Sequence, residues 1–211
     1  MGSMAIVQAM QGIKAVLRHR GAWWVLLALG LLPLAGLVWQ TFTDQLGPNP
    51  AEALIRSTGD WTLRGLCLTL AVTPLRVQMG WPELARFRRL LGLLTFGYAS
   101  LHLLCYAWFD MGLDWADVLR DIPKRPFVLV GSVALILLTL MAATSWNGAI
   151  RRMGARRWQA LHRSVYAVAV LAILHFWWMR AGKNDFNEVW VYGLIMAALL
   201  GWRVWRRKKH R

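Results

Sequence analysis

The sequence predicts an all-α integral membrane protein, a bundle of six transmembrane helices with the N and C termini in the cytoplasm. Three observations lead to this prediction. Hydrophobic residues make up 57% of the 211 residues and the mean hydropathy is +0.40, which is more apolar than a typical soluble domain. The apolar residues fall into six long runs, and Lys and Arg gather in alternate connections between the runs. The whole chain, residues 1–211, is therefore expected to form one transmembrane domain.

Charged or turn-forming residues bound each run, and the run lengths approach what a membrane requires. A hydrocarbon core about 30 Å thick needs about 20 helical residues at a rise of about 1.5 Å each. Each run is expected to be helical, because a helix satisfies its own backbone groups in lipid. In order, the predicted helices are Ala22–Phe42, Trp61–Gln78, Leu90–Phe109, Phe127–Trp146, Val165–Arg180 and Val189–Trp205. The first exceeds the apolar region of a usual signal peptide and lacks a clear cleavage site, so it is interpreted as a retained anchor.

The distribution of charge predicts the orientation. With the N-terminus in the cytoplasm, the inner connections and tails hold 18 of the 25 Lys and Arg residues, as the positive-inside rule requires. Nine of the ten acidic residues then lie outside, so an outer partner would meet a mixed or acidic surface. This topology accounts for the net charge of +15. Nucleic acid is not an expected partner, because no water-soluble basic domain is visible.

Redox chemistry in this chain would need a bound cofactor. Cys67 and Cys105 both lie in apolar runs, which disfavours a disulfide framework or a thiolate metal cluster. A glycine-rich phosphate loop after a strand is also missing from the sequence, so an attached nicotinamide-binding domain is not expected.

Two histidines are the strongest candidates for a functional site. His102 lies about seven residues before the outer end of its predicted helix and His175 about five before the outer end of its own, so both are expected at a depth of about 8–10 Å. Ionisable residues inside the membrane usually mark function. Two imidazoles at one depth on different helices can hold one metal as axial ligands, as haem b requires. Arg64, near the outer end of the second helix, is a candidate partner for a haem propionate. The alternative is that each histidine only hydrogen-bonds a neighbouring helix.

His162 has a less certain role. It precedes His175 by 13 residues, about 20 Å along a helix, which places it near the inner interface. A second haem there would need another ligand at the start of the third helix, where Arg88 and Arg89 are not normal haem ligands. His162 is therefore a candidate for a lone-ligand haem iron, a quinone, or a flavin phosphate held together with Arg88, Arg89, Arg156 and Arg157. The remaining alternative is an interfacial histidine among lipid-facing arginines.

At these residues the chain resembles the haem-binding membrane subunits of the bacterial methionine sulfoxide reductase system, within the ferric reductase-like transmembrane superfamily. The resemblance extends from Thr58 to Trp178 and preserves the spacing of all three histidines. Its motifs are Thr58-Gly59, Thr73-Pro74-Leu75, Arg88-Arg89-Leu90-Leu91-Gly92-Leu93, Leu101-His102-Leu103 with Tyr106, Arg125-Pro126, Thr144-Ser145, Arg157-Trp158-Gln159-Ala160-Leu161-His162, Val165-Tyr166 and His175. The resemblance implies a single ferric reductase-like transmembrane domain in which His102, His162 and His175 are associated with haem iron.

The resemblance also implies an electron-transfer function in the bacterial inner membrane. Electrons from the respiratory quinone pool would pass through haem b, with one or two haems in the chain and FMN as a further candidate cofactor. The acceptor would be a periplasmic molybdopterin-containing reductase, MsrP, which repairs methionine sulfoxide in envelope proteins and carries the bond-making catalysis. The donor would be separate from the chain, either quinone or a cytosolic flavin reductase.

Three rival functions stay open at this point. A standalone ferric or flavin-linked reductase cytochrome would use the same haem with a different acceptor. A transporter or proton channel would use the histidines as relay groups on broken helices. A purely structural subunit would tolerate the loss of all three histidines.

Overall fold

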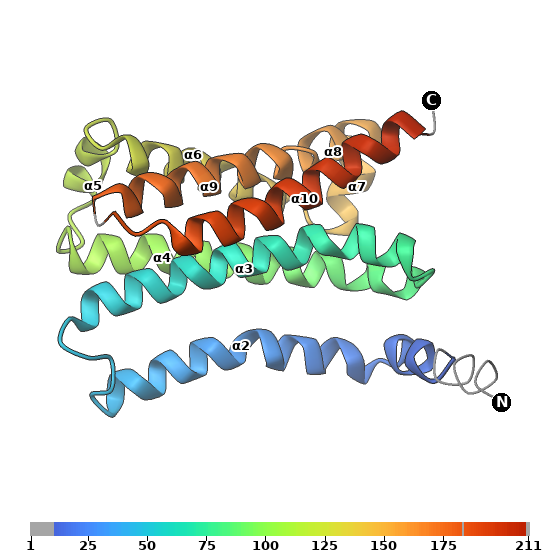
Figure 1. Ribbon diagram of the computed structural model, residues 1–211, viewed down its shortest axis with the longest axis horizontal. Coiled ribbons are helices and arrows are strands. Elements are labelled where there is room, and N and C mark those ends of the chain that lie inside the picture. The colour runs from blue at the N-terminus through green and yellow to red at the C-terminus, as the bar shows by residue number, and fades with distance from the viewer. Residues whose placement is uncertain (1–10, 183, 210–211) are drawn as a thin grey trace.

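The computed structural model describes residues 11–182 and 184–209, and throughout these ranges the regular structure is helical, without a β-strand. Within these residues six helices are long, and they run along the long axis of the molecule (Figure 1). They are α2 (Gly21–Phe42), α3 (Pro50–Gln78), α4 (Phe87–Phe109), α6 (Pro126–Ala143), α9 (Val165–Ala181) and α10 (Asn187–Lys209). The predicted all-α class is confirmed.

Short helical segments connect the long ones at the two ends of the bundle. The 3₁₀ helix η1 (Pro82–Arg86) leads into α4, and α5 (Trp115–Asp121) lies between α4 and α6. The helices α7 (Asn147–Met153) and α8 (Ala155–His162) join α6 to α9. Figure 1 shows α5 at one end, and α7 and α8 at the opposite end together with the start of α2 and the last turns of α10. We call these the α5 end and the α8 end of the bundle.

Within the part of the chain that the structure describes, four helical segments are long and apolar enough to cross a membrane: Gly21–Phe42, Pro82–Phe109, Pro126–Ala143 and Ala155–Ala181. The helices α3 and α10 are as long, but charged residues interrupt their apolar character. The chain is thus a membrane protein with several apolar helices. The count of six crossings and the cytoplasmic location of both termini stay predictions.

The predicted start of the second helix at Trp61 is wrong, because α3 begins eleven residues earlier, at Pro50. Asn49 caps this helix by accepting a hydrogen bond of 3.2 Å from the backbone N–H of Glu52, and Pro50 occupies the first helical position. The extra turns carry Glu52, Arg56 and Asp60 at four-residue intervals, which places these charges on one helix face. The same polar residues that suggested a loop therefore line one side of a helix.

The estimate of about 20 Å between His162 and His175 assumed a continuous helix between them, and the structure does not have one. The helix α8 ends at His162, and a turn at residues 163–164 separates it from α9, which begins at Val165. The preceding helix α6 ends at Ala143, three residues before the predicted Trp146. His162 therefore belongs to the connection at the α8 end of the bundle, and its position relative to His175 does not follow from one helical rise.

The buried core lies among α3, α4, α6, α9 and α10. Its members are Leu63, Leu66, Leu70, Ala99, Ala134, Leu138, Met141, Val168, Ala169 and Met196. The helix α3 packs mainly against α4, and α6 packs mainly against α9. In contrast, α2 buries only Leu37 among its 22 residues, and Tyr98 of α4 hydrogen-bonds its Gly30 carbonyl at 2.8 Å. The two packed helix pairs, α3/α4 and α6/α9, position the site described next.

Candidate metal centre

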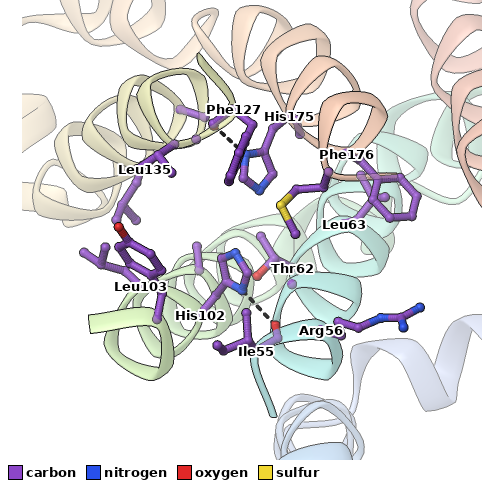
Figure 2. A pocket seen from close by; sticks show the side chains of 18 of the residues that line it. Ile55, Arg56, Thr62, Leu63, His102, Leu103, Phe127, Leu135, His175 and Phe176 are labelled. Atoms are coloured by element: carbon purple, nitrogen blue, oxygen red, sulfur yellow. Dashed lines mark hydrogen bonds between the residues drawn. The ribbon is translucent and has the colours of Figure 1, made fainter. Parts of the chain in front are cut away.

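The structure brings together the two histidines that sequence analysis selected as axial ligands. His102 on α4 and His175 on α9 face each other across a cavity (Figure 2). Their ring centroids are 6.0 Å apart and the ring planes are nearly perpendicular, at 86°. The cavity has a volume of about 570 Å³ and is lined by residues of α3, α4, α6 and α9. This volume is within the usual range for a small-molecule or cofactor site, about 300–1,000 Å³.

A main-chain carbonyl of a neighbouring helix orients each imidazole. The Nδ1 atom of His102 lies 2.9 Å from the carbonyl oxygen of Ile55 on α3, and Nδ1 of His175 lies 2.7 Å from that of Phe127 on α6. A carbonyl oxygen only accepts hydrogen bonds, so each Nδ1 must donate. In a neutral imidazole, Nε2 then keeps its lone pair, and Figure 2 shows these second ring nitrogens facing each other. Metal-binding histidines in proteins are held in this way.

The separation of the rings fits one metal ion between them. Two metal–nitrogen bonds of about 2 Å each, plus the distance of roughly 1 Å from each nitrogen to its ring centre, place the centroids about 6 Å apart. Within the described residues, no group of three or more His, Cys, Asp and Glu side chains could hold a metal ion. Other ligands of a metal at this point would have to come from a bound group. A porphyrin supplies four equatorial nitrogens and leaves two axial positions for imidazoles.

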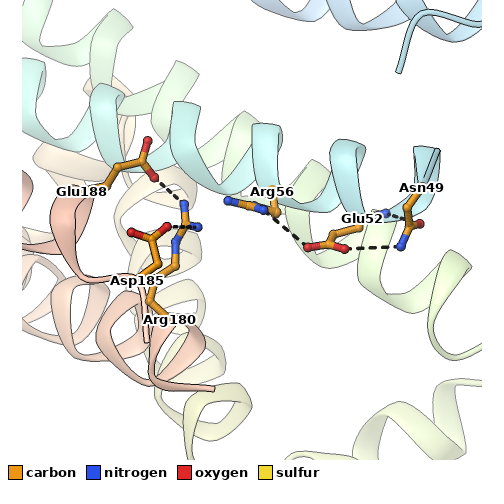
Figure 3. Close-up of polar contacts among 6 residues, drawn as sticks. All are labelled: Asn49, Glu52, Arg56, Arg180, Asp185 and Glu188. Atoms are coloured by element: carbon orange, nitrogen blue, oxygen red, sulfur yellow. Dashed lines mark hydrogen bonds and ion pairs between the residues drawn. The ribbon is translucent and has the colours of Figure 1, made fainter. Parts of the chain in front are cut away.

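Arginine and acidic side chains line one part of the cavity. Arg56, Arg125 and Arg180 all contribute to its wall. Arg180 is only 6% exposed and forms ion pairs with Asp185, at 3.3 Å, and with Glu188 (Figure 3). Figure 3 also shows Arg56 beside Glu52, to which it is paired at 3.5 Å. The cavity therefore combines an apolar interior with cationic groups that can bind carboxylates.

Arg64, the propionate candidate from sequence, does not contribute to the wall of this cavity. Its Nε atom donates a hydrogen bond of 3.0 Å to the hydroxyl of Tyr192 on α10. Its guanidinium carbon lies 4.7 Å from the ring centroid of Trp61. The structure thus places Arg64 between α3 and α10, whereas three other arginines line the cavity.

A hydrogen-bonded group lies beside the cavity at the α5 end. Asp121, the last residue of α5, accepts a hydrogen bond of 2.5 Å from the hydroxyl of Tyr106 and one of 2.8 Å from Nε of Arg125. The hydrogen bond from Tyr106, followed by the interaction with Arg125, holds the pKa of Asp121 below its ordinary value. Because Tyr106 and Arg125 both line the cavity, Asp121 links their positions to α5.

His162 lies away from this cavity, at the α8 end. Its Nε2 atom is 3.2 Å from the Thr144 hydroxyl, and its ring stacks on Trp158 with the centroids 3.9 Å apart. The four arginines that sequence analysis grouped with it, Arg88, Arg89, Arg156 and Arg157, are all exposed, and none of them lines the cavity. Arg89 donates a hydrogen bond of 3.4 Å to the side chain of Asn147.

Sequence reasoning missed several residues of the site. The carbonyl groups of Ile55 and Phe127 have no side-chain signature, so only the packing of the helices reveals them. Arg56 could have been found from its four-residue spacing between Glu52 and Asp60, which indicates a helix face rather than a loop.

The fold and the site together define a helical membrane protein in which two histidines face each other between two helix pairs. Residues 58–173 match the family described as the ferric reductase like transmembrane component. This range includes His102 and His162 and ends two residues before His175.

Similar proteins that share one name occur in several bacteria. The chain is 61% identical to the protein-methionine-sulfoxide reductase heme-binding subunit MsrQ of Polaromonas naphthalenivorans, over 93% of this chain and 90% of the relative. It is 51% identical to the MsrQ subunit of Bordetella pertussis, over 87% of this chain and 90% of the relative. It is 55% identical to the MsrQ subunit of Ralstonia nicotianae, over 84% of this chain and 82% of the relative. No solved structure matches the chain. The chain belongs to the MsrQ family within the ferric reductase like transmembrane proteins.

Proposed function

We propose that this chain holds haem b between His102 and His175 and relays electrons across the membrane for a methionine-sulfoxide reductase system. The observation that supports this most directly is the pair of carbonyl-anchored imidazoles, 6.0 Å apart, with their second nitrogens facing each other. The names of the relatives, heme-binding subunits of a protein-methionine-sulfoxide reductase, support the same cofactor.

The residues of the cavity divide into three roles in this proposal. His102 and His175 are the axial ligands, and their Nδ1 hydrogen bonds tune the basicity of the ligating nitrogens. The apolar walls exclude water and hold the ring. Arg180, Arg56 and Arg125 are better placed than Arg64 to pair with the propionates, because they line the cavity. When bound, haem supplies one-electron redox chemistry, and ligation, burial and hydrogen bonding set its potential.

The proposed direction of electron flow is from the α8 end to the α5 end. Quinone, or a flavin such as FMN, would deliver electrons near His162, Arg88, Arg89, Arg156 and Arg157, which lie on the positively charged side. The positive-inside rule favours this side as cytoplasmic, with both termini there and the chain in the bacterial inner membrane. Electrons would leave through the haem at the α5 end towards a periplasmic partner, MsrP. In this proposal the chain carries electrons, and MsrP reduces methionine sulfoxide.

The test is cofactor analysis of the purified full-length protein. A pyridine haemochrome and flavin assay per mole of protein is expected to give about one haem per chain. His102→Ala and His175→Ala should each abolish the bis-imidazole absorption spectrum of the reduced protein. The matched control is His19→Ala, because His19 is exposed and lies before α2. A reduced spectrum that stays unchanged in either cavity variant would remove the assignment.

A second candidate function is a standalone ferric reductase, which the description of the matching family favours. It would use the same haem site and differ only in the acceptor. Rates of electron delivery from the reduced protein to MsrP and to ferric chelates separate the two. The proposed function requires faster delivery to MsrP.

A further inference from the structure

Two glycines stand at equivalent positions beside the two histidines. His102 donates a hydrogen bond to the carbonyl of Ile55, and Gly59 lies four residues after Ile55 on α3. In the same way, His175 donates a hydrogen bond to the carbonyl of Phe127, and Gly131 lies four residues after Phe127 on α6. Residues four apart on a helix share one face. Each imidazole therefore rests on a helix face formed by a carbonyl and a glycine one turn further on.

The missing side chain is what allows each ring to come this close. A Cβ atom at Gly131 would lie 2.9 Å from Nδ1 and 3.0 Å from Cε1 of His175. One at Gly59 would lie 3.1 Å from Cε1 and 3.2 Å from Nδ1 of His102. Side chains on a helix point back towards its N-terminus, so a residue at position i+4 covers the carbonyl of residue i. Glycine at this position leaves the carbonyl open to a hydrogen-bond donor from another helix.

We propose that Gly59 and Gly131 are positioning residues that dock the two axial imidazoles onto α3 and α6 and hold their planes perpendicular. This inference rests on the proposed haem site and goes beyond it, because it assigns the 86° angle between the rings to two named backbone positions. Each docking position fixes the direction of an Nδ1–H bond, and with it the rotation of the ring about the axis through both Nε2 atoms.

The rotation of axial imidazoles has its own spectroscopic signature. Perpendicular ligand planes leave two iron d orbitals close in energy, so low-spin ferric haem shows a highly anisotropic electron paramagnetic resonance signal with a large maximal g value. Rotation of one ring so that the two planes become more nearly parallel separates the energies of these orbitals and lowers the maximal g value. The signal therefore reports ring orientation rather than the mere presence of haem.

The experiment compares Gly131→Ala and Gly59→Ala with wild type in haem-loaded, full-length protein. We expect Gly131→Ala to lower or split the maximal g value and to shift the haem midpoint potential. Gly59→Ala should show a smaller change in the same observables, since its Cβ would be less crowded. The matched control is Gly193→Ala on α10, where an added Cβ meets no atom within 4 Å, and it should behave as wild type.

The outcomes separate this inference from the proposed function. Wild-type signals and potentials in both glycine variants, with normal haem content, would overturn the positioning role while leaving the haem site intact. Loss of haem from Gly131→Ala with unchanged helical circular dichroism would support it. If Gly131→Ala does not fold, the test rests on the milder variant Gly59→Ala. A lowered maximal g value in that variant supports the positioning role, and a wild-type g value overturns it. A wild-type protein that binds no haem would overturn the proposed function itself, and this inference with it.

Discussion

The hydroxyl of Tyr106 on α4 donates a hydrogen bond of 2.5 Å to Asp121, the last residue of α5. This bond joins the wall of the histidine cavity to the short helix that closes the α5 end of the bundle. Arg125 binds the other carboxylate oxygen of Asp121 at 2.8 Å, so both oxygens have a donor. The group acts as a brace between α4 and α5, and its carboxylate, that of Asp121, lies outside the long apolar helices.

Acidification is expected to weaken this brace. The hydrogen bond from Tyr106 and the charge of Arg125 lower the pKa of Asp121 from its ordinary value of 3.8. A carboxyl group with a lower pKa in the folded state stabilises the fold above its unfolded pKa, and this contribution is lost as the pH falls through the folded pKa. At pH values below about 4, the unfolding temperature of the detergent-solubilised protein should therefore decrease.

Two variants isolate the contribution of Asp121. Asp121→Asn should be less stable than wild type at neutral pH and should lack this part of the acid-dependent loss. Asp117→Asn is the control, because that carboxylate is 57% exposed and its ion pair is with an exposed arginine. An identical acid response in Asp121→Asn and wild type would show that another group carries it.

Leu66 is expected to be essential to the core beside the cavity. It is 2% exposed, belongs to the buried cluster and also lines the cavity. Leu66→Ala should lower the free energy of unfolding by about 2–5 kcal/mol, the usual cost of truncating a buried leucine. Leu68→Ala on the same helix is the control, since Leu68 is 54% exposed. Equal losses in the two variants, measured by denaturant titration in the same detergent, would contradict the assignment of Leu66 to the core.

Arg180 is predicted to raise the haem potential more than Arg64 does. A nearby positive charge favours the reduced haem, and Arg180 is a buried cation in the cavity wall whereas Arg64 is bonded to Tyr192 outside it. Arg180→Gln should therefore lower the midpoint potential, because Asp185 and Glu188 would lose their cationic partner. Arg64→Gln should lower it less. Redox titration monitored by absorbance provides the measurement. A larger decrease of the midpoint potential in Arg64→Gln than in Arg180→Gln would indicate that Arg64, rather than Arg180, pairs with a propionate.

The long helices could be predicted because apolar length and bounding charge are local properties of the sequence. Each of the six predicted helices overlaps one of the six long helices of the structure. The first eleven residues of α3 were missed, since Glu52, Arg56 and Asp60 are polar in sequence but share a helix face that borders the cavity. Periodicity of charges, rather than their number, was the signal that could have located this part of the helix.

The histidine side chains of the candidate site could be predicted from the sequence, but the main-chain groups that orient them could not. The constant helical rise relates a histidine's distance from the helix end to its depth, which is why His102 and His175 could be paired from sequence alone. Their partners are carbonyl groups of Ile55 and Phe127, which every residue possesses. Which carbonyl is open depends on how α4 packs on α3 and α9 on α6, and that is a property of the tertiary structure.

His162→Ala is predicted to separate electron delivery from haem binding. The imidazole lies at the α8 end, hydrogen-bonded to Thr144 and stacked on Trp158, so its loss should leave the bis-imidazole spectrum and haem content unchanged. Reduction by quinol should slow by roughly fivefold, the factor that corresponds to one net hydrogen bond of about 1 kcal/mol. Thr144→Val, which keeps the imidazole but removes its partner, should slow reduction less. Loss of half the haem in His162→Ala would instead indicate a second haem at this end, because a residue that binds only quinone or flavin contributes nothing to haem content.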